Sequence, residues 1–143
     1  LAIDYEPPRG GEVFISVNDG DKRNITAIAR SIARLGFSLV ATTGTARALR
    51  ASGIECEEVG KIHAGSHTIL DRIASGEIVL MINTPFGSST NTDGYEMRAA
   101  CVRHGVSYCT TLAGAQALIA GMEAVRETGL DVVALQDLPQ WEG

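Results

Sequence analysis

A hydroxyl-rich turn is the first feature of this chain that could do chemistry. Ala41-Thr42-Thr43-Gly44-Thr45-Ala46 follows the apolar run 37–40, which predicts a strand passing directly into a helix that begins at Thr45. The unpaired N–H groups and positive dipole end of a helix start favour an anion, most often a phosphate. The threonines add donors, and Gly44 permits close approach of the backbone. Because threonine is also an ordinary helix cap, the turn is either a phosphate cradle or a plain helix start.

Two lysines could supply positive charge to such a cradle. Lys22 follows the turn Asn18-Asp19-Gly20-Asp21 and is expected to open the first helix, where an ammonium is unfavourable for the helix dipole unless an anion is present. Lys61 follows a weak predicted strand, in Gly60-Lys61-Ile62-His63. For each lysine, the alternative is a solvated surface residue.

Polar residues also follow the later predicted strands. Asn83-Thr84-Pro85 closes the strongest apolar run, 78–82. These residues either contact the base, ribose or phosphate of a ligand at the edge of the sheet or form a simple turn. Thr110-Thr111 repeats the strand–threonine–helix pattern and could cap a helix, bind a ligand, or do both. Arg98 could complete an anion pocket or pair with Asp93 on the same helix.

Neither catalytic residues nor a metal site are expected. No Ser-His-Asp order, pair of active carboxylates or activated cysteine stands out. His63, His67 and Asp71 have a four-residue spacing that could hold a metal, but Gly65 interrupts that helix and Ser66 is its better cap. The turn at 42–45 also matches neither the Walker A loop nor the G-x-G-x-x-G fingerprint.

Composition limits the remaining classes of function. The 143 residues suit one domain with a real core, and a net charge of −5 argues against non-specific nucleic-acid binding. No run approaches the roughly 20 apolar residues of a membrane span, and no signal peptide is evident. Cys56, Cys101 and Cys109, odd in number and without C-x-x-C spacing, are typical of free thiols in a reducing cytoplasm. The chain begins at Leu1 rather than Met, so whether it is part of a longer protein stays open.

Apolar runs and helical periodicity alternate along the chain, which predicts an α/β fold with a parallel sheet covered on both faces. Such sheets bind ligands at the carboxyl ends of their strands, near the topological switch point. Residues 1–11 are expected to be a linker or tail, 12–138 the domain and 139–143 a second tail. Strands are predicted at 13–17, 37–40, 54–59, 78–82, 106–109 and 132–135, and helices at 25–35, 46–52, 66–75, 92–105 and 112–126.

Taken in order, several short motifs resemble the methylglyoxal-synthase-like domain at the C-terminus of the carbamoyl-phosphate synthase large chain. The resemblance runs from Gly11 to about Leu138. Each piece is weak alone, whereas the ordered set is specific. The pieces are Ser16-Val17-x-x-Gly20-Asp21-Lys22, Ala41-Thr42-x-Gly44-Thr45-Ala46, Gly53-Ile54, Lys61-x-His63-x-Gly65, Asp71-Arg72-Ile73-x-x-Gly76, Ile82-Asn83-Thr84 and Tyr108-x-Thr110-Thr111-Leu112.

The resemblance implies a three-layer α/β/α, Rossmann-type fold with a five-stranded, mostly parallel sheet. It implies a non-catalytic allosteric domain of the synthase that makes carbamoyl phosphate from glutamine, bicarbonate and ATP for pyrimidine and arginine biosynthesis. The effectors would be UMP as inhibitor and, in some bacterial members of the family, IMP as activator, with no intrinsic cofactor. The partners would be the rest of the large chain and the glutaminase small subunit, without nucleic acid or membrane; a homo-oligomer stays open.

The resemblance also assigns residues. Thr110 matches a threonine tied to ornithine activation, with Thr111 beside it, and Arg98 matches a recurrent arginine. Pro85 departs from the pattern, because bacterial relatives often have a second threonine there, and it removes a hydroxyl and an N–H from the pocket edge. The nucleotide pocket would comprise Ser16, Lys22, Thr42, Gly44, Thr45, Lys61, Asn83 and Thr84.

Two other members of the same fold group are alternatives. Methylglyoxal synthase, a phosphate lyase acting on dihydroxyacetone phosphate, uses carboxylate bases and a histidine. Here Ser66 and His67 stand where that enzyme is acidic, and the loop before Asp93 lacks its His-Asp-Pro-Asp run. The IMP cyclohydrolase domain is the third option, but the motif spacing favours the synthase domain.

Overall fold

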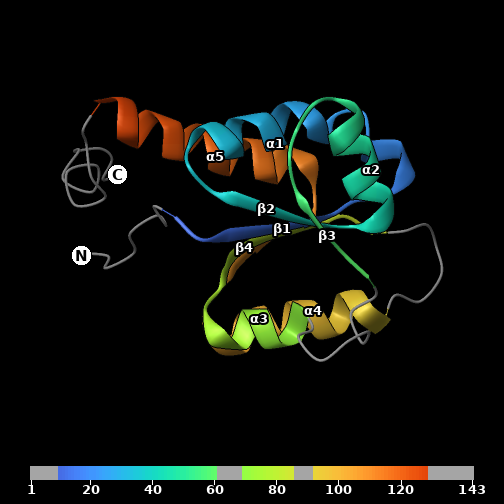
Figure 1. Cartoon of the computed structure of the whole chain (residues 1–143). Helices are drawn as coiled ribbons and strands as arrows, with labels where there is room; N and C mark the ends of the chain where they lie inside the picture. Colours follow the sequence, from blue (N-terminus) through green and yellow to red (C-terminus); the bar gives the residue numbers. More distant parts are fainter. Residues whose placement is uncertain (1–9, 61–68, 86–91, 129–143) are drawn as a thin grey trace.

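The computed structural model describes residues 10–60, 69–85 and 92–128, with the side chains of Thr92, Asp93 and Thr128 also outside the description. Strands and helices alternate through these residues (Figure 1). In chain order the elements are β1 (Glu12–Ser16), the 3₁₀ turn η1 (Asp19–Asp21), α1 (Ile25–Arg34), β2 (Ser38–Thr42), α2 (Thr43–Ala51), β3 (Glu57–Val59), α3 (Ile69–Ser75), β4 (Ile78–Asn83), α4 (Thr92–His104), β5 (Ser107–Cys109) and α5 (Leu112–Thr128).

The five strands form one parallel sheet in the order β3-β2-β1-β4-β5. The chain builds outward from β1 through β2 to β3 and then returns to the other side of β1 with β4. The strand order therefore reverses between β1 and β4, and the crevice outside their carboxyl ends is the place where such sheets bind ligands. Among the described helices, none is long and apolar enough to cross a bilayer.

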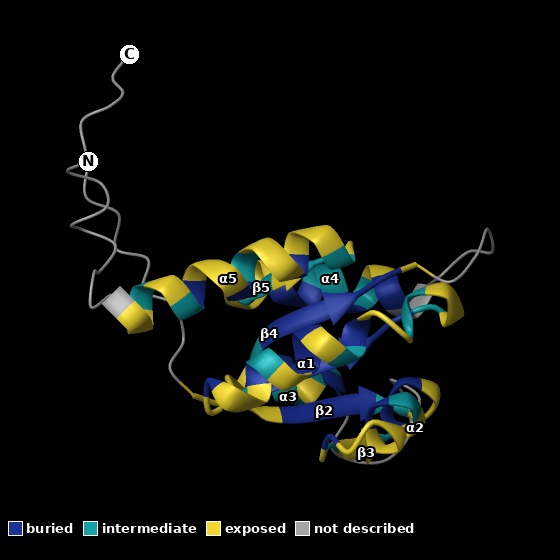
Figure 2. Cartoon of the chain, turned by 90° about the horizontal axis from the view of Figure 1, so that it is seen from above, coloured by how far each residue is buried: buried dark blue, intermediate teal, exposed yellow. Residues whose placement is uncertain are grey.

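Helices cover both faces of the sheet. In Figure 1, α1, α2 and α5 lie on one face, and α3 and α4 lie on the other. Because successive strand residues point to opposite faces, Val13 and Ile15 join the core under α1, α2 and α5. Phe14 and Met81 join the second core against α3 and α4. The middle of β2 and nearly all of β4 are accordingly buried in Figure 2.

The predicted α/β class and the five-stranded, mostly parallel sheet are confirmed, and every described strand pair is parallel. Several element ends are shifted. The helix predicted from Thr45 begins at Thr43, so β2 passes into α2 with no intervening loop. Lys22 does not open α1; it closes η1, and α1 begins at Ile25. Glycine ends helices as expected: Gly53 has a φ of +80° just beyond α2. The predicted strand 132–135 and the cap at Ser66 lie outside the described residues.

The two cores make a direct prediction for stability. Phe14, in the central strand, is 1% exposed, so Phe14→Ala should lower the free energy of unfolding by about 3–5 kcal/mol. Tyr95→Ala, at a side chain that is 67% exposed, should change it by less than about 0.5 kcal/mol. Urea unfolding followed by circular dichroism measures both, and equal losses would contradict this core assignment.

Candidate functional site

The end of β1 is held by side chains from two other segments. Val17 is fully buried just after the strand ends, so its backbone N–H and carbonyl need partners inside the protein. Thr45 Oγ1 accepts the hydrogen bond from Val17 N at 3.1 Å. Lys22 Nζ donates to the Val17 carbonyl at 2.9 Å. Both contacts bring the first turn of α2 and the ammonium of Lys22 to the same edge of the sheet.

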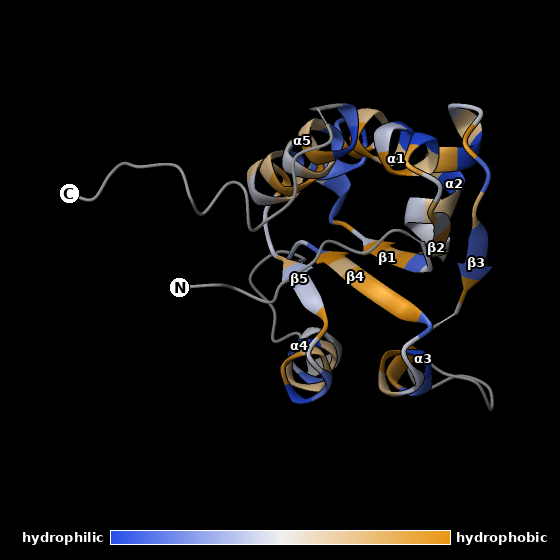
Figure 3. Cartoon of the chain, turned by 90° about the vertical axis from the view of Figure 1, so that its left-hand side faces the viewer, coloured by the Kyte–Doolittle hydropathy of each residue, from blue (hydrophilic) through white to orange (hydrophobic). Residues whose placement is uncertain are grey.

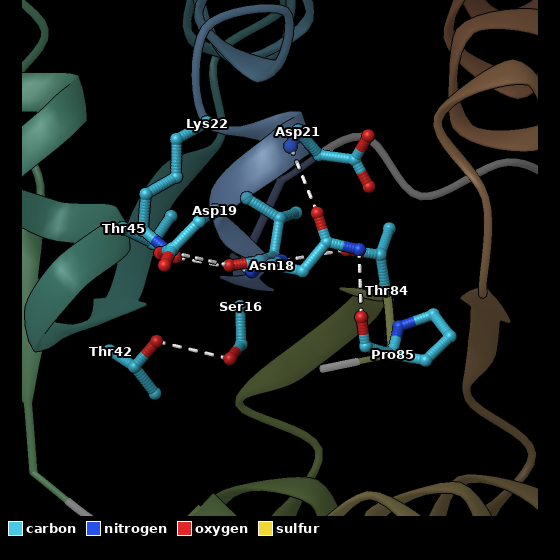
Figure 4. A network of polar contacts seen from close by, with 10 residues as sticks. Ser16, Asn18, Asp19, Asp21, Lys22, Thr42, Thr45, Thr84 and Pro85 are labelled. Carbon is cyan, nitrogen blue, oxygen red and sulfur yellow. Dashed lines mark hydrogen bonds and ion pairs between the residues drawn. The ribbon is translucent and has the colours of Figure 1, made fainter. Parts of the chain in front are cut away.

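The Lys22 ammonium lies against the start of α2 (Figure 4). A Cβ added to Gly44 would lie 3.1 Å from Lys22 Cε and 3.5 Å from Nζ, so the glycine leaves room for this side chain. The first N–H groups of α2 have no partner within the helix, and its dipole places partial positive charge there. A lysine held in such a position concentrates positive charge at one point, which is the electrostatic condition for binding an anion.

Asp19 is the residue that pairs with this ammonium in the ligand-free chain. Its Oδ1 lies 2.8 Å from Lys22 Nζ, and its side chain is 99% exposed. The hydrogen bond and charge of Lys22 lower the pKa of Asp19. The sequence analysis placed no carboxylate beside the turn at 42–45, so Asp19 is a site residue that it missed. A fully exposed carboxylate with a lowered pKa is a weak general base, because efficient bases have a pKa near the working pH.

Three polar residues form a row along the carboxyl ends of β2, β1 and β4. Alternation along the strands places Thr42, Ser16 and Asn83 on the face that carries α3 and α4. Thr42 occupies the N-cap position of α2, yet its hydroxyl makes no cap bond and instead donates to Ser16 Oγ at 3.0 Å. Ser16 is paired in register with Asn83. Thr42 therefore joins neighbouring strands, which its capping role alone would not explain.

Asn83 carries the most unusual polar group of this edge. The residue is 1% exposed, and neither its Oδ1 nor its Nδ2 has a hydrogen-bond partner among the described residues. A buried amide without partners costs roughly 1–3 kcal/mol. A ligand that offers one donor and one acceptor to Asn83 would recover that cost.

Asn18, which the sequence-based site did not include, connects the two strands of the switch point. Its backbone N–H donates to Thr84 Oγ1 at 2.9 Å, and its Nδ2 donates to the Pro85 carbonyl at 2.7 Å. Its Oδ1 accepts from Asp21 N at 2.9 Å, which caps η1. Two features of the sequence pointed to Asn18: its place directly after the first predicted strand and the capping pattern Asn-Asp-Gly-Asp. Although Pro85 offers no N–H, its carbonyl takes part in this contact.

The remaining predicted site residues lie away from the carboxyl ends of β1, β2 and β4 or outside the residues that the structure describes. Lys61 falls in the range 61–68, which is not described. Arg98 is half-buried on α4 and has no recorded hydrogen bond within the described residues. Thr111 caps α5, because its Oγ1 accepts from Gly114 N at 3.0 Å. Thr110 is exposed at the carboxyl end of β5.

The three cysteines are not set up as nucleophiles. Burial raises the pKa of Cys101 to about 11 and also raises the pKa of Cys56 and Cys109. A thiol with a raised pKa is mostly protonated at neutral pH and reacts slowly.

Comparison with known proteins identifies the class. The sequence model of the MGS-like domain family matches residues 24–110, more than half of the chain, so the chain belongs to this family. Its curated relatives include carbamoyl phosphate synthase large chains. The C-terminal section from Methanopyrus kandleri is 49% identical over 96% of this chain, and the large chain from Myxococcus xanthus is 41% identical over 96%. This chain spans 26% and 13% of those two relatives.

Solved structures agree with the fold. Methylglyoxal synthase from Elizabethkingia anophelis aligns with a TM-score of 0.61 at 16% identity, covering 80% of each chain. ForH aligns with a TM-score of 0.60 at 21% identity, covering 83% of this chain and 80% of its own. At these identities the likeness concerns the α/β fold alone.

The contact between Thr45 and Val17 can be tested by an isosteric substitution. Thr45→Val keeps the shape but leaves the buried Val17 N–H without a partner, so it should lower the free energy of unfolding by about 1–3 kcal/mol. Thr43→Val, at an exposed position two residues earlier, should change it by less than about 0.5 kcal/mol. Thermal or urea unfolding of both variants is the measurement, and an unchanged Thr45→Val protein would show that this bond does not anchor β1.

Proposed function

We propose that this chain is an allosteric domain of a carbamoyl-phosphate synthase large chain and that it binds a nucleoside monophosphate, with UMP as inhibitor and IMP as activator. The observation that carries the proposal is the Lys22 ammonium held against the first turn of α2. The family and its curated relatives support the parent enzyme. Its partners would be the rest of the large chain and the glutaminase small subunit, and the domain needs no cofactor of its own.

The phosphate would take the place that Asp19 occupies beside Lys22. Asp19 is fully exposed and can turn into solvent, whereas Lys22 Nζ stays anchored to the Val17 carbonyl. The first N–H groups of α2 and the exposed hydroxyl of Thr43 would supply further donors. This exchange keeps the ammonium paired, so the phosphate gains a charge-assisted contact without leaving a buried charge alone.

The nucleoside would lie across the row Thr42, Ser16 and Asn83. The Ser16 hydroxyl accepts from Thr42 and retains its own proton to donate. The carboxamide of Asn83 offers a donor and an acceptor, which matches ribose hydroxyls or the polar edge of a base. Binding regulates the synthase only if the nucleotide favours one state of the whole enzyme over another.

Calorimetric titration with UMP and with IMP tests the binding. Lys22→Ala should weaken UMP by about 1.5–3 kcal/mol, or roughly 10- to 150-fold, because a charge-assisted phosphate contact is lost. Arg103→Ala, which removes an exposed cation from the end of α4, should leave the affinity within about twofold. The absence of heat for both nucleotides at millimolar concentration would contradict the proposal.

Gly44→Ala separates binding from stability. The new Cβ would press on Lys22 Cε at 3.1 Å and narrow the approach to the first turn of α2, so UMP affinity should fall by about tenfold or more. Because alanine has the better helix propensity, by up to about 1 kcal/mol, the free energy of unfolding should stay equal or rise. Equal affinity in this variant would place the phosphate elsewhere.

The enzyme alternative has its own experiment. Asp19 beside Lys22 is the one observation that favours a phosphate lyase, so the chain is incubated with dihydroxyacetone phosphate and assayed for methylglyoxal and phosphate. We expect no turnover above the buffer rate. Turnover that Asp19→Asn abolishes would replace the regulatory proposal with the enzyme.

A further inference from the structure

The outer strand β3 buries little apolar surface. It is three residues long, both of its glutamates are exposed, and Val59 is its one apolar side chain and is partly buried. In Figure 3, β3 is strongly hydrophilic, whereas β1 and β4 contain hydrophobic residues. It pairs with β2 alone, because it is the last strand on its side of the sheet. Hydrophobic burial therefore holds β3 only weakly, and other contacts must keep it in place.

Arg72 of α3 binds the first residue of β3. Its Nη2 lies 2.6 Å from Glu57 Oε2 and its Nη1 lies 3.2 Å from Glu57 Oε1, so the pair is bidentate. Nη1 also lies 3.2 Å from Oε1 of Glu12, the first residue of β1. Because β2 lies between β1 and β3, one guanidinium connects two strands that are not neighbours in the sheet. Arg72 thus fixes β3 relative to the central strand.

Two arginines bind β3 from opposite faces, and water reaches them to different degrees. The Arg72 side chain is 12% exposed and that of Glu57 is 51% exposed, and their hydrogen bond raises the pKa of Arg72. On the other face, Arg50 of α2 binds Glu58 at 3.0 Å, and these side chains are 49% and 39% exposed. Water and salt weaken an exposed pair, whereas a bidentate pair with a shielded guanidinium is stronger. Arg72 is therefore the main anchor of β3.

β3 ends beside the candidate nucleotide site. Val59 is paired in register with Thr42, whose hydroxyl donates to Ser16. Because β3 is so short, the ion-paired Glu57 is only two positions from this contact. Ile54 is buried in the core under α1, α2 and α5, so the chain is anchored before β3 begins. An opening of β3 can therefore stay local, and it would remove the outer backbone neighbour of Thr42.

We propose that Arg72 is a positioning residue for the candidate nucleotide site. Through Glu57 it holds β3 against β2 and keeps the side of the site next to Thr42 in place. When this pair is lost, β3 separates from β2 while the rest of the sheet stays folded. The positioning of the site rests on the proposed function, whereas the anchoring of β3 does not. Nucleotide binding at Thr42 and closure of β3 would favour each other, because coupling between two equilibria is reciprocal.

Amide hydrogen exchange tests the anchoring. In Glu57→Gln, the amides of residues 57–59 should exchange about tenfold faster or more, while those of β4 should change by less than about twofold. Glu58→Gln is the matched control, because it neutralises the next glutamate of the same strand, which also binds an arginine. It should speed the exchange of β3 by less than about threefold. Arg72→Lys keeps the charge without the planar fork, so its exchange should lie between those of the wild type and Arg72→Gln.

Calorimetric titration with UMP tests the positioning. Glu57→Gln should weaken UMP by about fivefold or more, because part of the binding free energy is then needed to close β3. Glu58→Gln should leave the affinity within about twofold. UMP should also slow the exchange of residues 57–59 in the wild-type chain, which a purely structural ion pair would not produce.

Separate results would overturn the two parts of this proposal. Unchanged exchange of β3 in Glu57→Gln, or equal increases in Glu57→Gln and Glu58→Gln, would overturn the anchoring. An equal increase in β4 would do the same, because the loss would then be one of global stability. Unchanged UMP affinity in a Glu57→Gln chain with an open β3 would overturn the positioning. A wild-type chain that binds no UMP contradicts the proposed function and the positioning with it, while the exchange comparison still decides the anchoring.

Discussion

The site depends on how β1 ends. At Val17 the central strand leaves the sheet while still buried, and a buried backbone N–H and carbonyl must be paired. Their partners are Thr45 from α2 and Lys22 from the segment before α1. One requirement of the backbone therefore positions a helix N-terminus and an ammonium together. The proposed anion site is a consequence of closing the strand, since neither group could move away without leaving a buried polar atom of Val17 unpaired.

The same helices give the domain two edges of different character. α1 and α2 run from the carboxyl edge of the sheet, where Lys22 and the start of α2 lie, to the amino edge. There Arg34 and Arg50 lie in the last turns of the two helices, at the negative ends of their dipoles. Arginine at a helix C-terminus is favourable by itself, so these residues stabilise the helices. The membership of this chain in the MGS-like family explains the fold.

Element types followed from the sequence because apolar periodicity reports burial directly. The run 78–82 became β4, and the spacing of Ile25, Ile28 and Ile32 became the buried side of α1. The junction of β2 and α2 was less predictable. Threonine suits both a strand and a helix cap, so the sequence Thr-Thr-Gly-Thr does not indicate which residue turns. The structure begins the helix at Thr43 and gives the Thr42 hydroxyl to Ser16 instead of to a cap.

The sequence by itself determined which residues stand at strand ends, because alternation and turn chemistry are local properties of the chain. That is why Thr42, Asn83 and Thr84 could be named in advance, whereas Ser16 was named from the resemblance to the synthase domain. Their contacts were decided by tertiary structure. Thr42 meets Ser16 across 26 residues, and Asn18 meets Thr84 across 66. Strand order and register set those pairs, and neither is encoded in a local pattern. The pairing of Asp19 with Lys22 is local, across three residues, whereas Lys22 reaches the start of α2 only because β1 and β2 lie side by side.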